Sequence, residues 1–477
     1  MHAESSHTDS THADRSHDQP SRGQALRGEK SRGNSSPDDA SCPRPEHAWS
    51  RRQLLGALAG VAGGAVASGA IGTGAIGTGG FDTLLRPAVA EQLKSKQKQV
   101  LLIWLDGGIS QLESWDPKPD SEFGGPFRAI PTSVPGVHFS ELLPNTAKQA
   151  HQLAIVRSMS TKDENHSTGV PRVLRGDPKN RGVDYPYLGA AVAKLAGQPD
   201  SSLPPYVWVK PGRGGYLWQH AGFLGAKYGA LALGDGKPPI HIHRPDSIGE
   251  TDDETRQQLR IAANQRFRKG RREAEVDAYE YSFDVARRLM QRKELFDDKT
   301  LDPRDVERYG RHPLGRHLLQ ARRLIEAGVL FVQVTSYHWD THSDNFNMHL
   351  QLVPQIDRPF AALIEDLSQR GLLDNTLVVL MSEFGRTPKI NQRLGRDHWP
   401  EAWSLALAGC GVKRGIVVGK TTPNGAFCDA PEYDVGHLFH TIFRAIGIDS
   451  KKIEYDNHGQ PLPIAHDDCT AITELLA

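Results

Sequence analysis

The sequence is poor in cysteine and has no excess of either charge. Its four cysteines, Cys42, Cys410, Cys428 and Cys469, are widely spaced and form no C-x-x-C pattern. This spacing predicts neither a zinc ribbon nor a disulfide framework, although a single disulfide is possible in an oxidising compartment. Basic and acidic residues number 57 each, so charge favours neither nucleic acid nor an anionic membrane surface as a partner.

Strongly apolar runs and long repeats are also missing. The stretch from Gly56 to Gly80 is weakly apolar, rich in glycine, and contains Gly-Ala-Ile-Gly-Thr twice. A hydrocarbon crossing needs roughly 20 strongly apolar residues, so no stable membrane span is predicted. After residue 90 no period of about 20 to 50 residues recurs, which excludes solenoids and propellers.

The N-terminal region has the order of an export signal. Residues 1–48 are rich in Ser, His, Arg, Asp and Pro and are predicted to be disordered. Arg51 and Arg52 then precede the weakly apolar run, and Ala88-Val89-Ala90 offers a cleavage site. We interpret residues 49–90 as a twin-arginine signal region, with a chance arginine pair before a linker as the alternative. This interpretation predicts passage through the twin-arginine export machinery to the periplasm or the extracellular space.

The remaining chain alternates strand and helix patterns. Apolar runs predict buried strands at 99–105, 329–335 and 376–381, with shorter strands at 153–157 and 404–407. Helix patterns cover 187–195 and 438–446, and a further helical stripe comprises Phe360, Leu363, Ile364 and Leu367. A strand–helix–strand order predicts an α/β fold with a mostly parallel sheet covered by helices on both faces. We expect one such domain over 97–475.

A charged segment interrupts this alternation. Asp252 to Phe296 consists of strong helix formers and carries a cluster of basic residues between Arg266 and Arg272. It predicts a helical insertion at about 250–300 whose basic face is solvated, with an anion site as the alternative.

Acids and imidazoles follow the predicted strands in three places. Asp106 ends the first strand, His338 to Asn345 follow the strand at 329–335, and Glu383 to Arg386 follow the strand at 376–381, with Gly395 to Pro400 close behind. The carboxyl ends of parallel strands converge at one edge of a sheet, so we expect these groups to meet. Their ligand types suit zinc, manganese or iron. The alternatives are an ordinary turn at Asp106 and a hydrogen-bonded polar loop after residue 337.

A fourth stretch, Asp163 to Gly169, precedes a predicted helix. The free backbone N–H groups at the start of that helix could bind an anion, and His166, Ser167 or Thr168 could attack a substrate. An ordinary helix cap supplied by Ser167 or Thr168 explains the same pattern.

Several of these motifs together resemble a known family. They are D-G-G-I-S-Q-L-E-S-W-D-P-K-P at 106–119, N-H-S-T-G at 165–169, W-D-T-H at 339–342, S-E-F-G-R-T-P-K-I-N at 382–391 and G-R-D-H-W-P at 395–400. In this order they resemble the sulfatase-like family called domain of unknown function 1501, which is similar to the alkaline phosphatase superfamily. The resemblance implies a three-layer α/β fold, one or two divalent metal ions, including calcium among the candidates, and hydrolysis of sulfate or phosphate esters.

The resemblance also implies roles for particular residues. The implied metal ligands are Asp106, Asp340, His342, Glu383 and His398, and the implied catalytic residues are His166, Ser167 and the oxyanion-binding Arg386. Two positions depart from the superfamily's pattern. Phe384 replaces a ligating histidine, for which Asp344 or His338 could substitute, and His166 stands where a hydroxyl or thiol is expected.

Three functions remain open at this point. The first is an exported metal-dependent hydrolase acting on a small-molecule or polysaccharide ester. The second is a non-catalytic, metal-containing protein that binds a sulfated or phosphorylated polymer, which the two departures favour. The third is an assembly protein with a vestigial cleft, in which the helical insertion mediates association.

Overall fold

The computed structural model describes residues 98–176, 179, 181–197, 203–212, 220–237, 242–269 and 273–477. The predicted disordered extension at 1–48 and the predicted signal region at 49–90 lie outside these residues. Among the residues described, no helix combines the length and the apolar character that a bilayer crossing requires.

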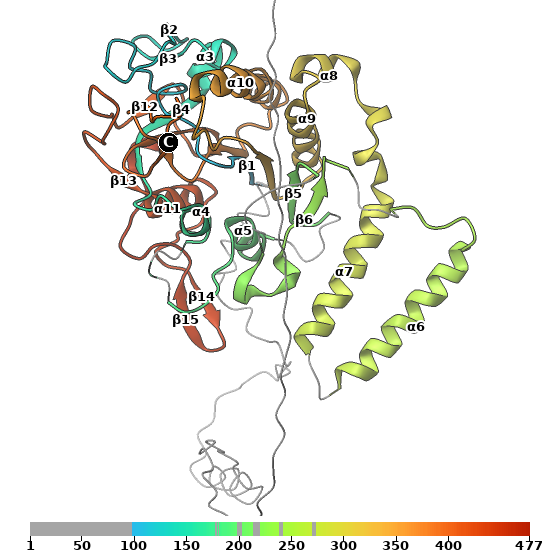
Figure 1. Cartoon of the computed structure of the whole chain (residues 1–477). Helices are drawn as coiled ribbons and strands as arrows, with labels where there is room; N and C mark the ends of the chain where they lie inside the picture. Colours follow the sequence, from blue (N-terminus) through green and yellow to red (C-terminus); the bar gives the residue numbers. More distant parts are fainter. Residues whose placement is uncertain are drawn as a thin grey trace, which may run out of the picture. The chain divides into compact units, whose positions relative to one another are not determined.

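The described part of the chain forms a nine-stranded central sheet (Figure 1). Eight strands follow the order β12-β4-β11-β8-β1-β7-β5-β6, and β13 also pairs with β4. Their bounds are β1 Gln99–Leu105, β4 Leu153–Ser160, β5 Tyr206–Lys210, β6 Leu231–Gly234, β7 Phe331–Ser336, β8 Thr376–Met381, β11 Trp403–Gly409, β12 Ile416–Val418 and β13 Tyr433–Asp434.

The sheet is mostly parallel, as the sequence predicts. Strand β1 lies between β7 and β8 and pairs in parallel with both. The β7–helix–β8 unit therefore spans β1 instead of joining two neighbouring strands. Strand β11 is the exception, since it runs antiparallel to both β8 and β4.

Helices cover both faces of the sheet. On one face lie α9 (Pro313–Glu326) and α10 (Asn345–Gln369), and on the other lie α4 (His166–Leu174), α5 (Leu188–Ala196) and α11 (Val435–Ala445) (Figure 1). Alternate side chains of β1 enter the two cores: Leu101, Ile103 and Leu105 pack with α9 and α10, whereas Val100, Leu102 and Trp104 pack with α5 and α11. A strand buried on both sides explains the uninterrupted apolar run at 99–105.

The charged insertion forms two long helices, α6 (Glu250–Arg268) and α7 (Glu273–Gln291), which lie side by side (Figure 1). Helix α6 buries none of its described side chains. Arg268, from the predicted basic cluster, forms ion pairs of 2.7 Å with Asp277 and 2.5 Å with Glu280 of α7. Two acids of α7 therefore neutralise the charge of one residue in that cluster, Arg268.

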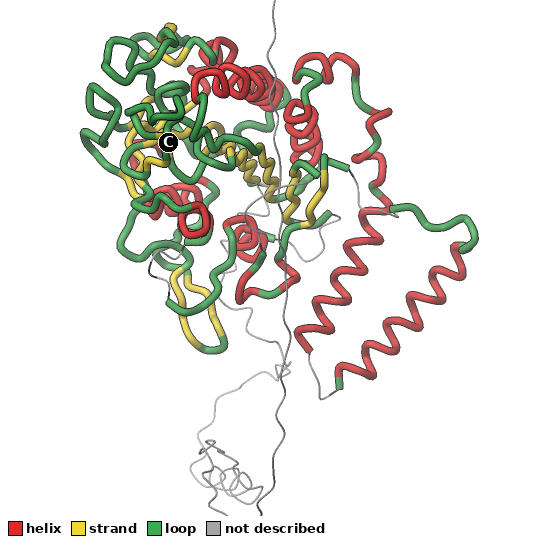
Figure 2. The backbone as a smooth tube through the Cα atoms, viewed as in Figure 1, coloured by secondary structure: helices red, strands yellow, loops and turns green. Residues whose placement is uncertain are grey.

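The other elements are short. They are β2 (Ala129–Pro131), β3 (His138–Ser140), α3 (Pro144–Gln149), η1 (Ala150–Gln152), η2 (Gly222–Leu224), η3 (Ala226–Tyr228), η4 (Lys293–Phe296), η5 (Asp298–Thr300), α8 (Pro303–Tyr309), β9 (Gly385–Arg386), β10 (His398–Trp399), β14 (Glu454–Asn457), β15 (Gln460–Pro463) and η6 (Thr473–Leu475). Much of the chain after β1 and after β8 is loop (Figure 2). These loops carry most of the predicted site residues.

Candidate active site

The loops after β1, β7 and β8 meet at the carboxyl edge of the sheet. Asp106 follows β1 directly, and the Gly107 N–H donates a 2.9 Å hydrogen bond to Glu383 Oε1 beyond β8. Gly107 has φ of +119°, and a Cβ there would lie 2.5 Å from the backbone nitrogen of Asp340. Only glycine combines this conformation with so close an approach. The D-G-G motif is therefore what lets the loop after β7 reach Asp106.

Asp106 and Glu383 form a buried pair of acids. Trp104 Nε1 donates a 3.0 Å hydrogen bond to Asp106 Oδ1. The other oxygens, Asp106 Oδ2 and Glu383 Oε2, are buried and have no hydrogen-bond partner among the described residues. Burial, followed by repulsion from Glu383, raises the pKa of Asp106 to about 7. Two buried carboxylates with unpartnered oxygens fit a cation, because such atoms are costly to bury alone.

A second group joins Asp340 to two histidines. Asp340 Oδ1 lies 3.1 Å from His342 Nε2 and 3.0 Å from His398 Nε2, and these two ring nitrogens are 2.9 Å apart. Burial alone would raise the pKa of Asp340, but hydrogen bonds from His166, His398 and Arg386 hold it far below its usual value. An ionised carboxylate with two imidazole nitrogens is a ligand set for a borderline divalent metal.

His166 connects the two groups. Its Nδ1 lies 2.7 Å from Glu383 Oε1, and its Nε2 lies 3.5 Å from Asp340 Oδ2. Burial would lower the pKa of His166, but Asp340 and Glu383 outweigh it and raise the pKa to about 9. His166, Asp340 and His398 each offer one ligand atom, and these atoms lie within 4.8 Å of one another. With Arg386, whose guanidinium lies 2.6 Å from Asp340 Oδ1, the structure thus brings together seven of the eight predicted site residues, all but Ser167.

The motifs that form this site also identify the family. Residues 97–476 match the family described as "Protein of unknown function (DUF1501)". The chain belongs to the DUF1501 family. No protein among those with curated descriptions matches it.

Solved structures similar to this DUF1501 chain include three bacterial hydrolases. A sulfatase from Pseudoalteromonas sp. is 14% identical, with 82% of this chain and 76% of that chain covered and a TM-score of 0.38. A phosphonate monoester hydrolase of Agrobacterium radiobacter is 11% identical, with 80% of this chain and 77% of that chain covered and a TM-score of 0.33. An alkaline phosphatase from the Antarctic bacterium TAB5 is 13% identical, with 73% of this chain and 98% of that chain covered and a TM-score of 0.28.

Phe384 is a packing residue in this DUF1501 site. It is buried, and its ring centroid lies 4.4 Å from that of His398 and 5.1 Å from that of His166. The proposed substitutes for a ligand at this position, His338 and Asp344, are both exposed. Asp344 accepts a hydrogen bond from Asn347, and the histidine–aspartate cluster around His166 contains neither substitute.

Arg386 occupies a different place from the one its predicted role requires. The sequence predicts an oxyanion clamp, but the side chain is buried. Its guanidinium donates to the carbonyl oxygens of Gly107, Gly108 and Trp339 and, at 2.6 Å, to Asp340 Oδ1. Because these acceptors occupy its donors, the geometry suits a residue that positions Asp340 and the loop after β1.

Ser167 also differs from its predicted role. It is exposed, and its hydroxyl donates a 2.7 Å hydrogen bond to Asn165 Oδ1. The cap of α4 is Asn165, whose side chain accepts from the Ser167 N–H, and neither Ser167 nor Thr168 supplies it. The N-H-S-T-G motif therefore encodes a cap followed at once by the site residue His166.

Sequence reasoning gave no role to Asp397. Its Oδ1 accepts from His342 Nδ1 at 2.7 Å and from Asn391 Nδ2 at 2.9 Å. Such a carboxylate fixes the ring orientation and tautomer of a metal-binding histidine. Its place beside His398 in the G-R-D-H-W-P motif is the signal that could have identified it.

A cavity of about 740 Å³ adjoins the acids. Asp106 and Asp340 lie in its wall, together with an apolar part that includes Leu314, Met348 and Leu352. His317, also in this wall, is buried, and its Nε2 has no hydrogen-bond partner among the described residues. Burial lowers the pKa of His317 to about 4, so its imidazole is neutral near pH 7. The cavity can hold an organic group beside the acids.

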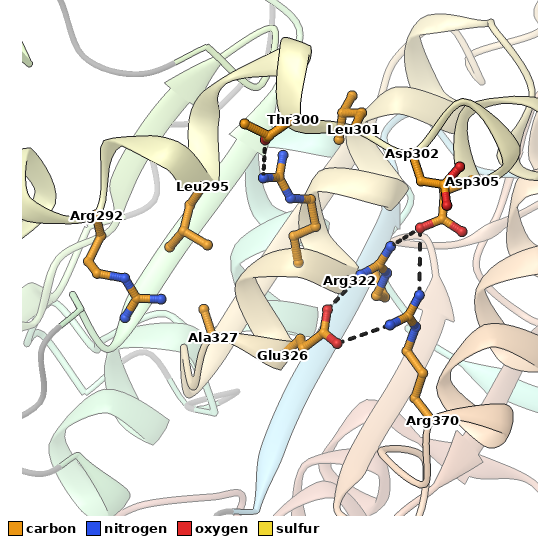
Figure 3. A pocket seen from close by; sticks show the side chains of 11 residues that line it. Arg292, Leu295, Thr300, Leu301, Asp302, Asp305, Arg322, Glu326, Ala327 and Arg370 are labelled. Atoms are coloured by element: carbon orange, nitrogen blue, oxygen red, sulfur yellow. Dashed lines mark hydrogen bonds and ion pairs between the residues drawn. The ribbon is translucent and has the colours of Figure 1, made fainter.

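Another pocket, of about 450 Å³, lies between η4, α8 and α9 and is lined by several arginines (Figure 3). Arg322 and Arg370 point at acids within the pocket wall, and both contact Asp305 and Glu326. Since these guanidiniums are already neutralised by carboxylates, the pocket is a weaker candidate for an anionic substrate than the carboxyl edge of the sheet.

Proposed function

We propose that this chain is an exported metal-dependent hydrolase of sulfate or phosphate esters. The observation that carries the proposal is the convergence of Asp106, Glu383 and Asp340 with His342 and His398 at one edge of the sheet. Arg386 and His166 pair with Asp340 and Glu383, but one buried oxygen of Asp106 and one of Glu383 have no partner among the described residues, and a bound cation would satisfy both. Export rests on the sequence of residues 49–90.

The proposed ligands divide into two sets. Asp106 and Glu383 would hold one cation through their unpartnered oxygens, and Asp340, His342 and His398 would hold another. A divalent cation bound there supplies charge that stabilises the oxygens of the ester and offsets the carboxylates around His166. Asp397 and Arg386 position the second set from behind.

We assign the attack on the ester to His166. Glu383 holds its imidazole inside the site, whereas the hydroxyl of Ser167 is exposed and bonded to Asn165. His166 is also the first residue of α4, where backbone N–H groups favour a bound anion. An attacking imidazole must be neutral, so the carboxylate charge that raises its pKa has to be compensated before the step.

The cavity beside Asp106 and Asp340 would receive the organic part of the ester. Its wall combines apolar side chains with Asp235, Gln355 and the neutral His317. Such a wall suits a substrate with both apolar and hydrogen-bonding surface, such as a sugar ring. The predicted small-molecule and polysaccharide esters include substrates of this kind.

A non-catalytic binding protein is the second candidate. Phe384 supports it, because an apolar ring occupies a position where the superfamily places a ligand. In that case the metal and the cavity would bind a sulfated or phosphorylated polymer without cleaving it.

Metal content and turnover test the proposal together. We expect the exported protein to contain about one or two equivalents of divalent metal and the Asp340→Ala variant to lose most of it. Asp344→Ala, an exposed acid in the same loop, is the matched control and should keep the metal. Sulfate and phosphate monoesters are then screened with all three proteins. Metal without turnover would favour the binding protein, and a folded, metal-free protein would refute both.

If turnover is found, His166→Ala and Ser167→Ala separate the two nucleophiles. Loss of turnover only in Ser167→Ala would transfer the attack to the hydroxyl.

A further inference from the structure

A second cluster of ligand-type side chains lies at the start of α11 and uses none of the proposed active-site residues. Asp434 caps α11, and its Oδ1 accepts a 3.0 Å hydrogen bond from the Gly436 N–H. His466 and Cys469 come from the C-terminal segment after β15, in a turn closed by a 3.1 Å hydrogen bond from the Cys469 N–H to the His466 carbonyl. One ligand atom from each of the three side chains lies within 4.8 Å of the others.

His466 is the most unusual member of this cluster. It is 1% exposed, and within the described residues neither of its ring nitrogens has a hydrogen-bond partner. Nδ1 lies 3.6 Å from Asp434 Oδ1, too far for a hydrogen bond. Buried imidazole nitrogens nearly always have a hydrogen-bond partner, so two nitrogens with none among the described residues point to a ligand at this ring.

Gly436 brings the three groups onto one side of the first turn of α11. A Cβ at this position would lie 2.4 Å from His466 Nδ1 and 2.6 Å from Cys469 Sγ. The glycine therefore leaves room for the imidazole and the thiol to approach the helix together. Cys469 is a free, buried thiol, and Phe439 stacks on His466 with a centroid distance of 5.8 Å.

We propose that Asp434, His466 and Cys469 bind a zinc-type divalent cation. Oxygen, nitrogen and sulfur donors are the ligand types that zinc prefers. Ligand bonds of about 2.0 to 2.3 Å in tetrahedral geometry place neighbouring ligand atoms roughly 3.3 to 3.7 Å apart. The 3.6 Å between His466 Nδ1 and Asp434 Oδ1 fits this spacing. On binding, the thiol releases its proton to solvent and the thiolate ligates the metal, while a water completes the coordination.

The position of the cluster indicates a structural role. The metal would tie the C-terminal turn at 466–469 to the start of α11. Asp434 Oδ2 also accepts a 2.6 Å bond from Arg172 of α4, the helix that begins with His166. The metal would thus hold together the two helices that cover the sheet beside the proposed active site.

Cobalt binding to the full chain, with Co²⁺ as the only metal added to chelated protein, tests the site separately from the ester hydrolase. A thiolate ligand gives Co²⁺ an intense near-ultraviolet charge-transfer band, and the proposed active site contains no cysteine. We expect the band in the unaltered protein, its loss in Cys469→Ser and in His466→Gln, and its retention in Cys428→Ser. Cys428 is a free cysteine outside the cluster and serves as the matched control.

Stability gives a second readout. Zinc should raise the melting temperature of the unaltered protein more than that of a folded Cys469→Ser variant, because a ligand that binds only the native state stabilises it. A band that survives in Cys469→Ser, or no band in the unaltered protein, would overturn the proposal. Neither result would affect the ester-hydrolase proposal, whose ligands are different.

Discussion

Two dense clusters of charge in this protein are built in opposite ways. At the carboxyl edge of the sheet, Asp106 and Glu383 each keep one buried oxygen that has no hydrogen-bond partner among the described residues. Between α9 and α10, Arg322 has a carboxylate for each part of its guanidinium: Asp305 at 2.5 Å, Glu326 at 2.6 Å and Asp366 at 3.0 Å. In the first cluster Arg386 and His166 pair with Asp340 and Glu383 but leave those two oxygens without a partner, whereas in the second cluster the carboxylates and the guanidinium of Arg322 pair with one another.

Whether the buried charged groups all have partners distinguishes a functional site from a structural ion-pair network better than the number of charges does. Buried ion pairs contribute little net stability, but removing one partner is costly because the other remains buried and charged. A buried acid whose pKa is raised by burial and by a neighbouring acid, as the pKa of Asp106 is, is instead typical of a functional site. Three experiments test whether the two clusters differ in this way.

The largest effect is expected from Arg322→Met. Asp366 is 2% exposed and would keep Arg370 at 2.8 Å but lose Arg322 at 3.0 Å, while Asp305 and Glu326 would each lose a guanidinium. The free energy of unfolding should therefore fall by about 3 kcal/mol, the lower end of the range for breaking a buried ion pair. Denaturant unfolding measures the change. Metal content per folded molecule should stay the same, and a loss of metal would show that the two clusters are coupled.

The next effect concerns Asp106 in the chelated protein. Its pKa is raised from 3.8 to about 7, so the native state holds a proton that the unfolded state releases. Below about pH 4 both states hold this proton, and the free energy of unfolding is then at its highest as far as Asp106 is concerned. As the pH rises from about 4 to about 7, the free energy of unfolding should fall by at most about 1.4 kcal/mol per pH unit. The difference between unaltered and Asp106→Asn proteins isolates it.

Metal should change that pH dependence. With a divalent cation bound to the ionised carboxylate, the decline between pH 4 and 7 should shrink or reverse, because the cation favours deprotonated Asp106. An unchanged decline in the presence of metal would place the cation away from Asp106.

The smallest effect is expected from Asp397→Asn. The amide keeps the size of the side chain but loses the charge that holds His342, and second-sphere changes of this kind reduce metal affinity about 10- to 100-fold. Competition with a chelator measures the affinity. Asp429→Asn, at an exposed ion pair with Lys420, is the control and should leave the affinity unchanged. An unchanged affinity in Asp397→Asn would contradict the positioning role.

Much of the central sheet could be predicted because its strands are buried on both faces. The run at 376–381 matches β8 residue for residue, and the run at 99–105 matches β1. The strand predicted at 404–407 was found, as the longer β11, but its antiparallel direction was not predicted. A short apolar run specifies burial, whereas the direction of a strand depends on where the connecting loops cross the sheet.

The sequence by itself determined the family, the α/β alternation and seven of the residues that meet at the carboxyl edge. It could do so because buried strands and strand-end acids leave local patterns. Only the tertiary structure decided that Arg386 supports Asp340 from a buried position, that Phe384 packs under two imidazoles, and that His466 and Cys469 meet Asp434. These relations join residues 14 to 218 positions apart, the extremes being Phe384 with His398 and Phe384 with His166. Packing fixes them through the directions of side chains, which no short sequence pattern records.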